Sequence, residues 1–434
     1  MPISSRDKQL LKLAVPALGA LLAEPLYVLA DTAVVGHLGT SALGGLGVSS
    51  SALMLIYGLC FFLAYGTTAT IARLTGAKEH KEAATQIVQS IWLAVFTGVF
   101  LGAIVFLFSS QLLGAMGATG DLLTQARIYL RISMYGAPAM LIMLAGVGYL
   151  RGVKDTVRPL WVSIGTAVLN LVIELVLIYG LDLGIGASAA ATVIAQWVGA
   201  FIYLVWIGKE IRIYNVSLAP QFLLLKRQIR VSTELLMRNL STAGTFLIAT
   251  AVATRISDVD VAAHQVAFQI WFTLAMAMDA MAIAAQAMVG NLLGAGAPVE
   301  ARKVGQRAIL WSVGVGIVGG GILAAVHLPL AEVFSNDPAV ISLSGFLFLH
   351  VALMAPLSGV AFALDGILIG AGDHNYLAKA MAVASISATS VMLLTRIWDL
   401  GIGWLWAAVW IFMGLRSVLL GSRFYGSRWQ VVGV

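Results

Sequence analysis

The chain has 434 residues, of which 60% are hydrophobic and 11% charged, and its formal net charge is +6. Its mean hydropathy is +0.94. So few polar residues cannot cover a soluble protein of this length, which excludes a water-soluble globular protein and predicts a membrane protein. The single cysteine, Cys60, excludes a disulfide framework.

Charge-poor runs of membrane length follow one another along the chain, and each is long enough to cross the hydrocarbon as a helix. In the first half they cover residues 11–36, 43–71, 86–108, 132–150, 159–180 and 186–207. In the second half they cover 232–254, 262–289, 308–331, 342–369, 380–398 and 402–420. Because a helix satisfies its own backbone hydrogen bonds in lipid, these runs predict an all-α membrane protein with twelve transmembrane helices.

The second half repeats the anchor points of the first half at a constant offset of 218 residues. The matching pairs are Gly76 and Gly294, Pro138 and Pro356, Gly148 and Gly366, Gly152 and Gly370, and Asp155 and Asp373. After a slip of one residue, the turn at 181–186 recurs at 398–403. Six spans in each repeat insert the same way up, so we expect two parallel six-helix bundles related by a pseudo-twofold axis along the membrane normal.

The expected domains are an N-terminal lobe (1–207), a polar linker (208–231) and a C-terminal lobe (232–434). Lys and Arg gather in alternate connections, among them the loops around 73–81 and 151–158, while the connections between these contain no Lys or Arg. This asymmetry predicts that the basic loops and both termini are cytoplasmic. Basic residues of the linker would lie near anionic headgroups, so the net charge requires no nucleic acid partner.

Ionisable side chains inside predicted spans are functional candidates because the membrane makes them costly. They are Glu24, Asp31, Glu174, Asp279 and Asp365. On the first helix, Glu24 and Tyr27 lie two turns and one turn before Asp31, so the three share a face. Pro16 and Pro25 remove backbone donors from the same helix and would let it bend.

Asn170 and Glu174 are spaced by four in an apolar run, so they face the same way on the fifth helix. In such surroundings a carboxyl group favours its protonated form, whereas a nearby cation favours the ionised form. The pair therefore predicts an exchange of a proton for a cation. The alternatives are a solvated helix end for Asp31 and a structural hydrogen bond between helices for Asn170 and Glu174.

At the equivalent repeat positions in the other half of the chain, four of these acids are replaced by apolar residues. They are Ala249 for Asp31, Val391 or Met392 for Glu174, Phe61 for Asp279, and Val147 for Asp365. We therefore expect the proton machinery to be asymmetric, with different acid positions in the two lobes. The acids of the second lobe would either bind a cation or form structural pairs.

Three sequence motifs resemble a known family across nearly the whole chain. They are LADTAVVGHLG at 29–39, AQAMVG at 285–290 before the loop GAG at 294–296, and ALDG at 363–366 leading to GAGD at 370–373. Together they resemble the multidrug and toxic compound extrusion (MATE) transporters, within which the chain is most similar to the DNA-damage-inducible F (DinF) branch.

The resemblance implies two six-helix bundles that open to alternate sides of the membrane and expel amphipathic cations in exchange for protons or sodium. It also implies that Asp31, Asn170 and Glu174 form the coupling site, and that Pro16 is where the helix bends on protonation. Several members carry Asp where this chain has Glu174. Gln286, in the second motif, joins Asp279 and Asp365 as a candidate of the second lobe.

The sequence thus predicts a multidrug antiporter, not an enzyme, in a prokaryotic plasma membrane. It would export hydrophobic organic cations as a monomer and would need no cofactor besides its coupling ion. The favoured coupling ion is a proton; the less favoured one is a sodium ion bound at Asp31, Asn170 and Glu174. The histidines lack metal-ligand spacing.

One alternative is a flippase for lipid-linked precursors, which would need several buried basic residues, yet only Arg238 approaches a span interior. The loop at 73–81 lacks the motif of another class, the major facilitators.

Overall fold

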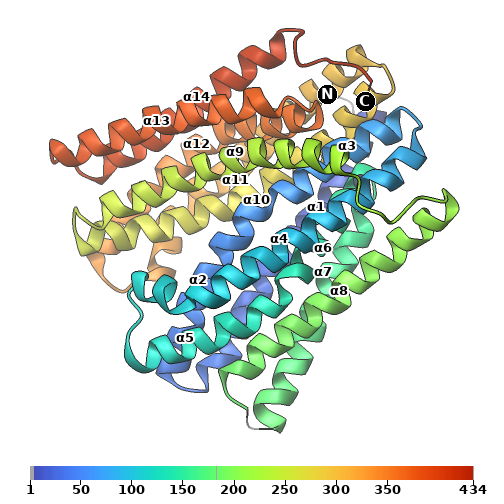
Figure 1. The fold of residues 1–434 in the computed structure, drawn as a ribbon. Helices are drawn as coiled ribbons and strands as arrows, with labels where there is room; N and C mark the ends of the chain where they lie inside the picture. Colours follow the sequence, from blue (N-terminus) through green and yellow to red (C-terminus); the bar gives the residue numbers. More distant parts are fainter. Residues whose placement is uncertain (1–3, 182, 434) are drawn as a thin grey trace. The chain divides into compact units, whose positions relative to one another are not determined.

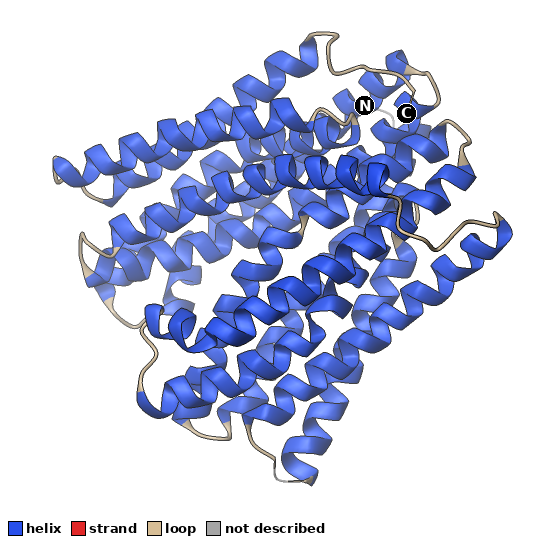
Figure 2. Cartoon of the chain, in the orientation of Figure 1, coloured by secondary structure: helices blue, strands red, loops and turns tan. Residues whose placement is uncertain are grey.

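The computed structural model describes residues 4–181 and 183–433, so Asp182 of the repeated turn lies outside the described residues. Across these ranges the chain is helical and contains no strand (Figure 2). Twelve helical stretches of 24 to 37 residues in the described chain are long and apolar enough to cross a membrane. The predicted all-α architecture with twelve membrane-length helices is confirmed.

Several spans of the first half are interrupted. Phe61 separates α2 from α3, a 3-10 turn (η1) precedes Pro138 in α6, and a π-helical turn (η2) follows α7. The elements, labelled in Figure 1, are α1 (Ser5–Gly36), α2 (Thr40–Cys60), α3 (Phe62–Gly76), α4 (His80–Ala115), α5 (Gly120–Ser133), η1 (Met134–Gly136), α6 (Ala137–Gly152), α7 (Val157–Leu175), η2 (Val176–Gly180) and α8 (Ile185–Ile213).

The spans of the second half are single helices. They are α9 (Phe222–Ala253), α10 (Asp258–Gly294), α11 (Pro298–Phe334), α12 (Pro338–Gly370), α13 (His374–Ile397) and α14 (Ile402–Tyr425). Only residues 214–221 of the predicted polar linker remain outside helices, because α8 extends to Ile213 and α9 already begins at Phe222.

The chain forms two compact units whose boundaries fall inside two helices. One unit comprises Met1–Leu18 with Thr233–Val434, and the other comprises Gly19–Ser232. Helices α1 and α9 are continuous across these boundaries. Each of the two helices therefore begins in one unit and continues into the other.

Close helix contacts explain why glycines recur at the repeat offset. A Cβ atom on Gly98 of α4 would lie 2.5 Å from the Cα of Pro138, and one on Gly316 of α11 would lie 2.9 Å from the Cα of Pro356. These two contacts occupy equivalent positions, 218 residues apart. Small residues let helix backbones approach closely in membranes. The repeat in the sequence therefore reflects the same helix packing in each unit.

Substituting Gly316 by Ala is expected to lower the stability of the protein by about 1–3 kcal/mol, because the added methyl group collides with the backbone of α12. Gly321→Ala on the same helix is the matched control, since nothing lies within 4 Å of its added carbon. Thermal unfolding in detergent, followed by helical circular dichroism, measures both variants. Equal melting temperatures for the two would contradict the packing argument.

Candidate ion-coupling site

Helices α1, α7 and α8 bring four of the predicted residues into one buried group within the unit Gly19–Ser232. The side chains of Asp31 and Asn170 are 3% exposed and that of Glu174 is fully buried. Tyr27 is half-buried beside them. The π-helical turn η2 begins two residues after Glu174, and such turns occur frequently at functional sites.

Tyr27, Asn170 and Thr192 form a closed set of hydrogen bonds. The Nδ2 amide of Asn170 donates to Tyr27 Oη at 3.0 Å and to Thr192 Oγ1 at 2.9 Å. Tyr27 Oη and Thr192 Oγ1 lie 3.0 Å apart. Because Thr192 Oγ1 donates to the carbonyl of Ser188 at 3.1 Å, the tyrosine hydroxyl is left to donate to Thr192. This set holds α1, α7 and α8 together.

The two carboxyl groups lie next to this set. The Ser188 hydroxyl donates to Asp31 Oδ1 at 2.6 Å, and Glu174 lies beside both Asp31 and Ser188. Neither carboxyl oxygen of Glu174 makes a hydrogen bond, and the Oδ1 atom of Asn170 has no donor either. Buried polar atoms are normally satisfied. Three acceptor oxygens on one face of α7 therefore favour binding of a proton or a small cation.

Sequence reasoning missed Ser188 and Thr192, the two residues by which α8 takes part in the site. Their spacing of four, in an otherwise apolar run, places both hydroxyls on one helix face and was the signal that could have found them. The spacing alone does not identify the residues that these hydroxyls contact.

The remaining candidates on α1 lie outside this group. Glu24 is exposed, although it is two turns from the buried Asp31. Pro16 and Pro25 both lie inside the continuous helix α1, and Pro16 is two residues before the boundary between the two units at Leu18.

A second buried charged cluster lies in the other unit, on α9, α12 and α14. Asp365 forms an ion pair with Arg238, and its Oδ2 atom lies 3.0 Å from Arg416 Nη2. Arg238 also donates to Asn239 Oδ1 at 2.7 Å, and the Arg416 guanidinium lies 4.9 Å above the ring of Phe362. The side chains of Asp365 and Arg416 are 2% and 1% exposed. The expectation that only Arg238 approaches a span interior was wrong, because α14 also buries an arginine in this cluster.

Asp279 and Gln286, the other candidates of the second lobe, lie two turns apart on α10. Asp279 is half-buried and Gln286 is buried. The backbone of Gln286 lies against Gly370 of α12, where a Cβ atom would come within 2.9 Å of its Cα. Gln286 is thus placed at a tight contact between two helices.

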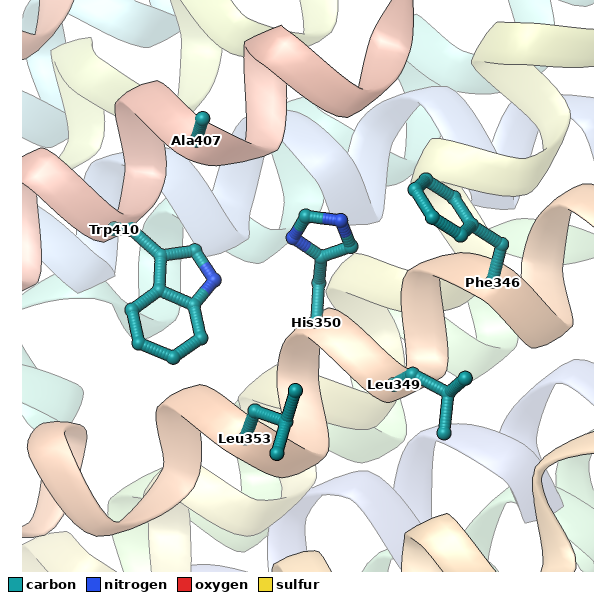
Figure 3. A pocket seen from close by; sticks show the side chains of 6 residues that line it. All are labelled: Phe346, Leu349, His350, Leu353, Ala407 and Trp410. Atoms are coloured by element: carbon teal, nitrogen blue, oxygen red, sulfur yellow. The ribbon is translucent and has the colours of Figure 1, made fainter.

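A cavity of about 520 Å³ lies between α12 and α14. Its lining consists of Phe346, Leu349, His350, Leu353, Ala407 and Trp410 (Figure 3). The His350 ring packs edge-on against Phe346, with centroids 4.8 Å apart. None of the predicted site residues lines this apolar cavity, so it is separate from the carboxyl pair.

Twelve membrane-length helices in two repeats, with a carboxyl pair buried in one of them, define a membrane transporter. The family model MatE matches residues 16–176 and 235–394, and the chain belongs to this family, the MATE transporters. The resemblance drawn from the three sequence motifs is thereby confirmed.

Curated relatives match nearly the whole chain. The chain is 32% identical to Protein DETOXIFICATION 44, chloroplastic, of Arabidopsis thaliana, covering 96% of this chain and 82% of that protein. It is 30% identical to DNA damage-inducible protein F of Escherichia coli, covering 97% and 92%. It is 26% identical to the probable multidrug resistance protein NorM of Thermotoga maritima, covering 98% and 93%.

Solved structures share the fold. An outward-facing multidrug resistance MATE family transporter superposes with a TM-score of 0.86 at 22% identity, over 98% of this chain and 97% of that one. The bent form of the Vibrio cholerae MATE transporter VcmN gives 0.87 at 21% identity, over 98% and 97%. At these identities the likeness concerns the fold alone.

Proposed function

We propose that this protein is a secondary antiporter that exports amphipathic organic cations in exchange for protons, with sodium as the less favoured coupling ion. The observation that carries this proposal is the buried pair of Asp31 and Glu174. Two adjacent carboxyl groups removed from water cannot both remain ionised without a partner, because each desolvated charge repels the other. A proton or a small cation must therefore accompany the pair.

The surrounding residues support an exchange at this pair. Ser188 holds one oxygen of Asp31, so the site keeps its shape when the second oxygen gains or loses a proton. When the pair ionises, the negative charge attracts an organic cation, and renewed protonation on the other side of the membrane releases it. The uncompensated oxygens of Asn170 and Glu174 are hard ligands of the kind that sodium requires. In this proposal α1 bends at Pro16 as the charge changes.

The setting follows from the same reasoning. The multidrug resistance names of several relatives support an organic cargo, and the loop charges support both termini on the inside. We place the protein in a prokaryotic plasma membrane as a monomer, although the name of the Arabidopsis relative assigns that protein to the chloroplast. Asp365 is engaged by two arginines, so we assign it a structural lock. We keep Gln286 as a helix-contact residue and assign no part in coupling to Asp279.

The test is transport of a fluorescent lipophilic cation by the purified protein in proteoliposomes, under an imposed pH gradient or an imposed sodium gradient. We expect the pH gradient to drive transport and the sodium gradient to drive it weakly or not at all. Protein-free liposomes under the same gradients are the control. If the protein moves no cation under either gradient, the antiporter proposal is wrong and a flippase becomes the leading function.

A further inference from the structure

The first turns of α1 pack in the unit formed mainly by the second repeat, and the first turns of α9 pack in the unit formed mainly by the first repeat. We call residues 5–18 the α1 start and residues 222–232 the α9 start. The α1 start belongs to the unit that contains Thr233–Val434, and the α9 start belongs to the unit Gly19–Ser232. Both helices run on without interruption. The two helix starts are therefore exchanged between the repeats.

Charged groups hold the α1 start against α11. Asp7 is fully buried and accepts hydrogen bonds from Arg307 Nε at 2.8 Å, Arg307 Nη2 at 2.5 Å and Trp311 Nε1 at 2.8 Å. One residue earlier, Arg6 forms an ion pair with Glu300, also on α11. Hydrogen bonds to charged groups are stronger than neutral ones, and breaking a buried ion pair leaves a desolvated charge.

Neutral groups hold the α9 start and the segment before it against α4. Gln89 donates from Nε2 to the carbonyl of Ala219 at 3.2 Å and accepts from the amide of Gln221 at 2.8 Å. Gln228 donates to Ser90 Oγ at 2.8 Å and to a backbone carbonyl of α4 at 3.2 Å. No residue among these carries a charge.

The two attachments are equivalent in the repeat. Gln89 of α4 and Arg307 of α11 are 218 residues apart, so they stand at the same position of the two repeats. Asp7, which attaches the α1 start, corresponds in the same way to the apolar Leu225 in the α9 start. Equivalent positions of α11 and α4 thus receive the two helix starts, through the charged groups of Asp7 on α11 and through neutral groups of residues 219–228 on α4.

We propose that the α1 start is a fixed anchor on α11, whereas the α9 start is a strap that releases from α4 when the two units reorient. The difference in chemistry decides which attachment opens. Each charged hydrogen bond is worth about tenfold more in the opening equilibrium than a neutral one, and Asp7 accepts three from α11. This inference goes beyond the proposed function, because it concerns the moving parts and not the cargo.

The first test needs no transport. Hydrogen exchange of the backbone amides, read by mass spectrometry on the protein in lipid nanodiscs, should be at least about tenfold slower in the α1 start than in the α9 start. Asp7→Asn should accelerate exchange of the α1 start alone, and Gln228→Leu that of the α9 start alone. Equal exchange in the two starts of the wild-type protein, or a slower α9 start, would overturn the proposal.

The second test locks each attachment chemically. In a Cys60→Ala background, Gln228→Cys with Ser90→Cys fixes the strap and Arg6→Cys with Glu300→Cys fixes the anchor, after treatment with a short, reducible thiol crosslinker. Locking the strap should stop cation efflux until reductant is added, while locking the anchor should leave efflux unchanged. Efflux that survives the locked strap would refute its release. A loss of efflux already before crosslinking would concern the proposed function, and the exchange test would still decide on the strap.

Discussion

Asp31→Asn should abolish cation efflux under a pH gradient, by roughly a hundredfold or more, because an amide can neither bind the coupling proton nor carry the charge that attracts the cargo. Glu174→Gln should have a similar effect, since it removes the second carboxyl group of the buried pair. The measurement is the initial rate of efflux from proteoliposomes at equal protein content. Helical circular dichroism of each variant establishes that the fold is retained.

Two matched variants separate coupling from general damage to the site. Glu24→Gln removes an acid from the same helix at an exposed position outside the buried group, so it should leave efflux within about twofold of wild type. Glu174→Asp keeps the charge on a shorter side chain and should retain measurable efflux. Full efflux by Asp31→Asn would remove the carboxyl pair from the mechanism, whatever the control variants do.

The fold was predictable because each step depended on local composition or on a repeat. Membrane-length apolar runs define helices regardless of their neighbours, and the recurrence of Pro138 as Pro356 marks helix contacts that both units share. The unit boundary inside α1 at Leu18 was not predictable. Hydropathy depends on a residue's own chemistry. The attachment of the α1 start to α11 depends instead on a contact between Asp7 and Arg307, which are 300 residues apart in the sequence.

The geometry of the candidate site was predictable where its residues share a helix. Asn170 and Glu174 were paired by their spacing, and the family resemblance joined them to Asp31. Ser188 and Thr192 were not predicted as site residues because small hydroxyl residues are common at helix contacts in membranes. Their spacing also does not identify the residues that they contact on the neighbouring helices.

The burial of Arg416 was not predicted for a different reason. This arginine lies near the end of the last predicted span, where a basic residue is ordinarily taken to reach the headgroups. Its burial became visible only through Asp365, a partner 51 positions earlier in the chain. Charged residues within predicted spans thus identify candidates, but their partners decide between coupling and structure.

The second large effect is expected from Asp365→Asn, which should lower the stability of the protein by about 3–5 kcal/mol. This variant removes the carboxylate that Arg238 and Arg416 both contact, so the pairing charge disappears while both guanidinium groups remain buried. Thermal and denaturant unfolding in detergent, followed by circular dichroism, measure the loss. A melting temperature equal to that of wild type would mean that the cluster does not hold α9, α12 and α14 together.

Replacing the cluster with apolar side chains distinguishes a structural lock from a transport site. The triple variant Arg238→Met, Asp365→Leu and Arg416→Met removes all three charges together, and such replacements of buried ionic clusters are often neutral or stabilising by about 1–4 kcal/mol. We therefore expect it to be more stable than Asp365→Asn and to retain efflux, because the carboxyl pair in the other unit is untouched. A stable triple variant that transports nothing would instead assign Asp365 a direct part in transport.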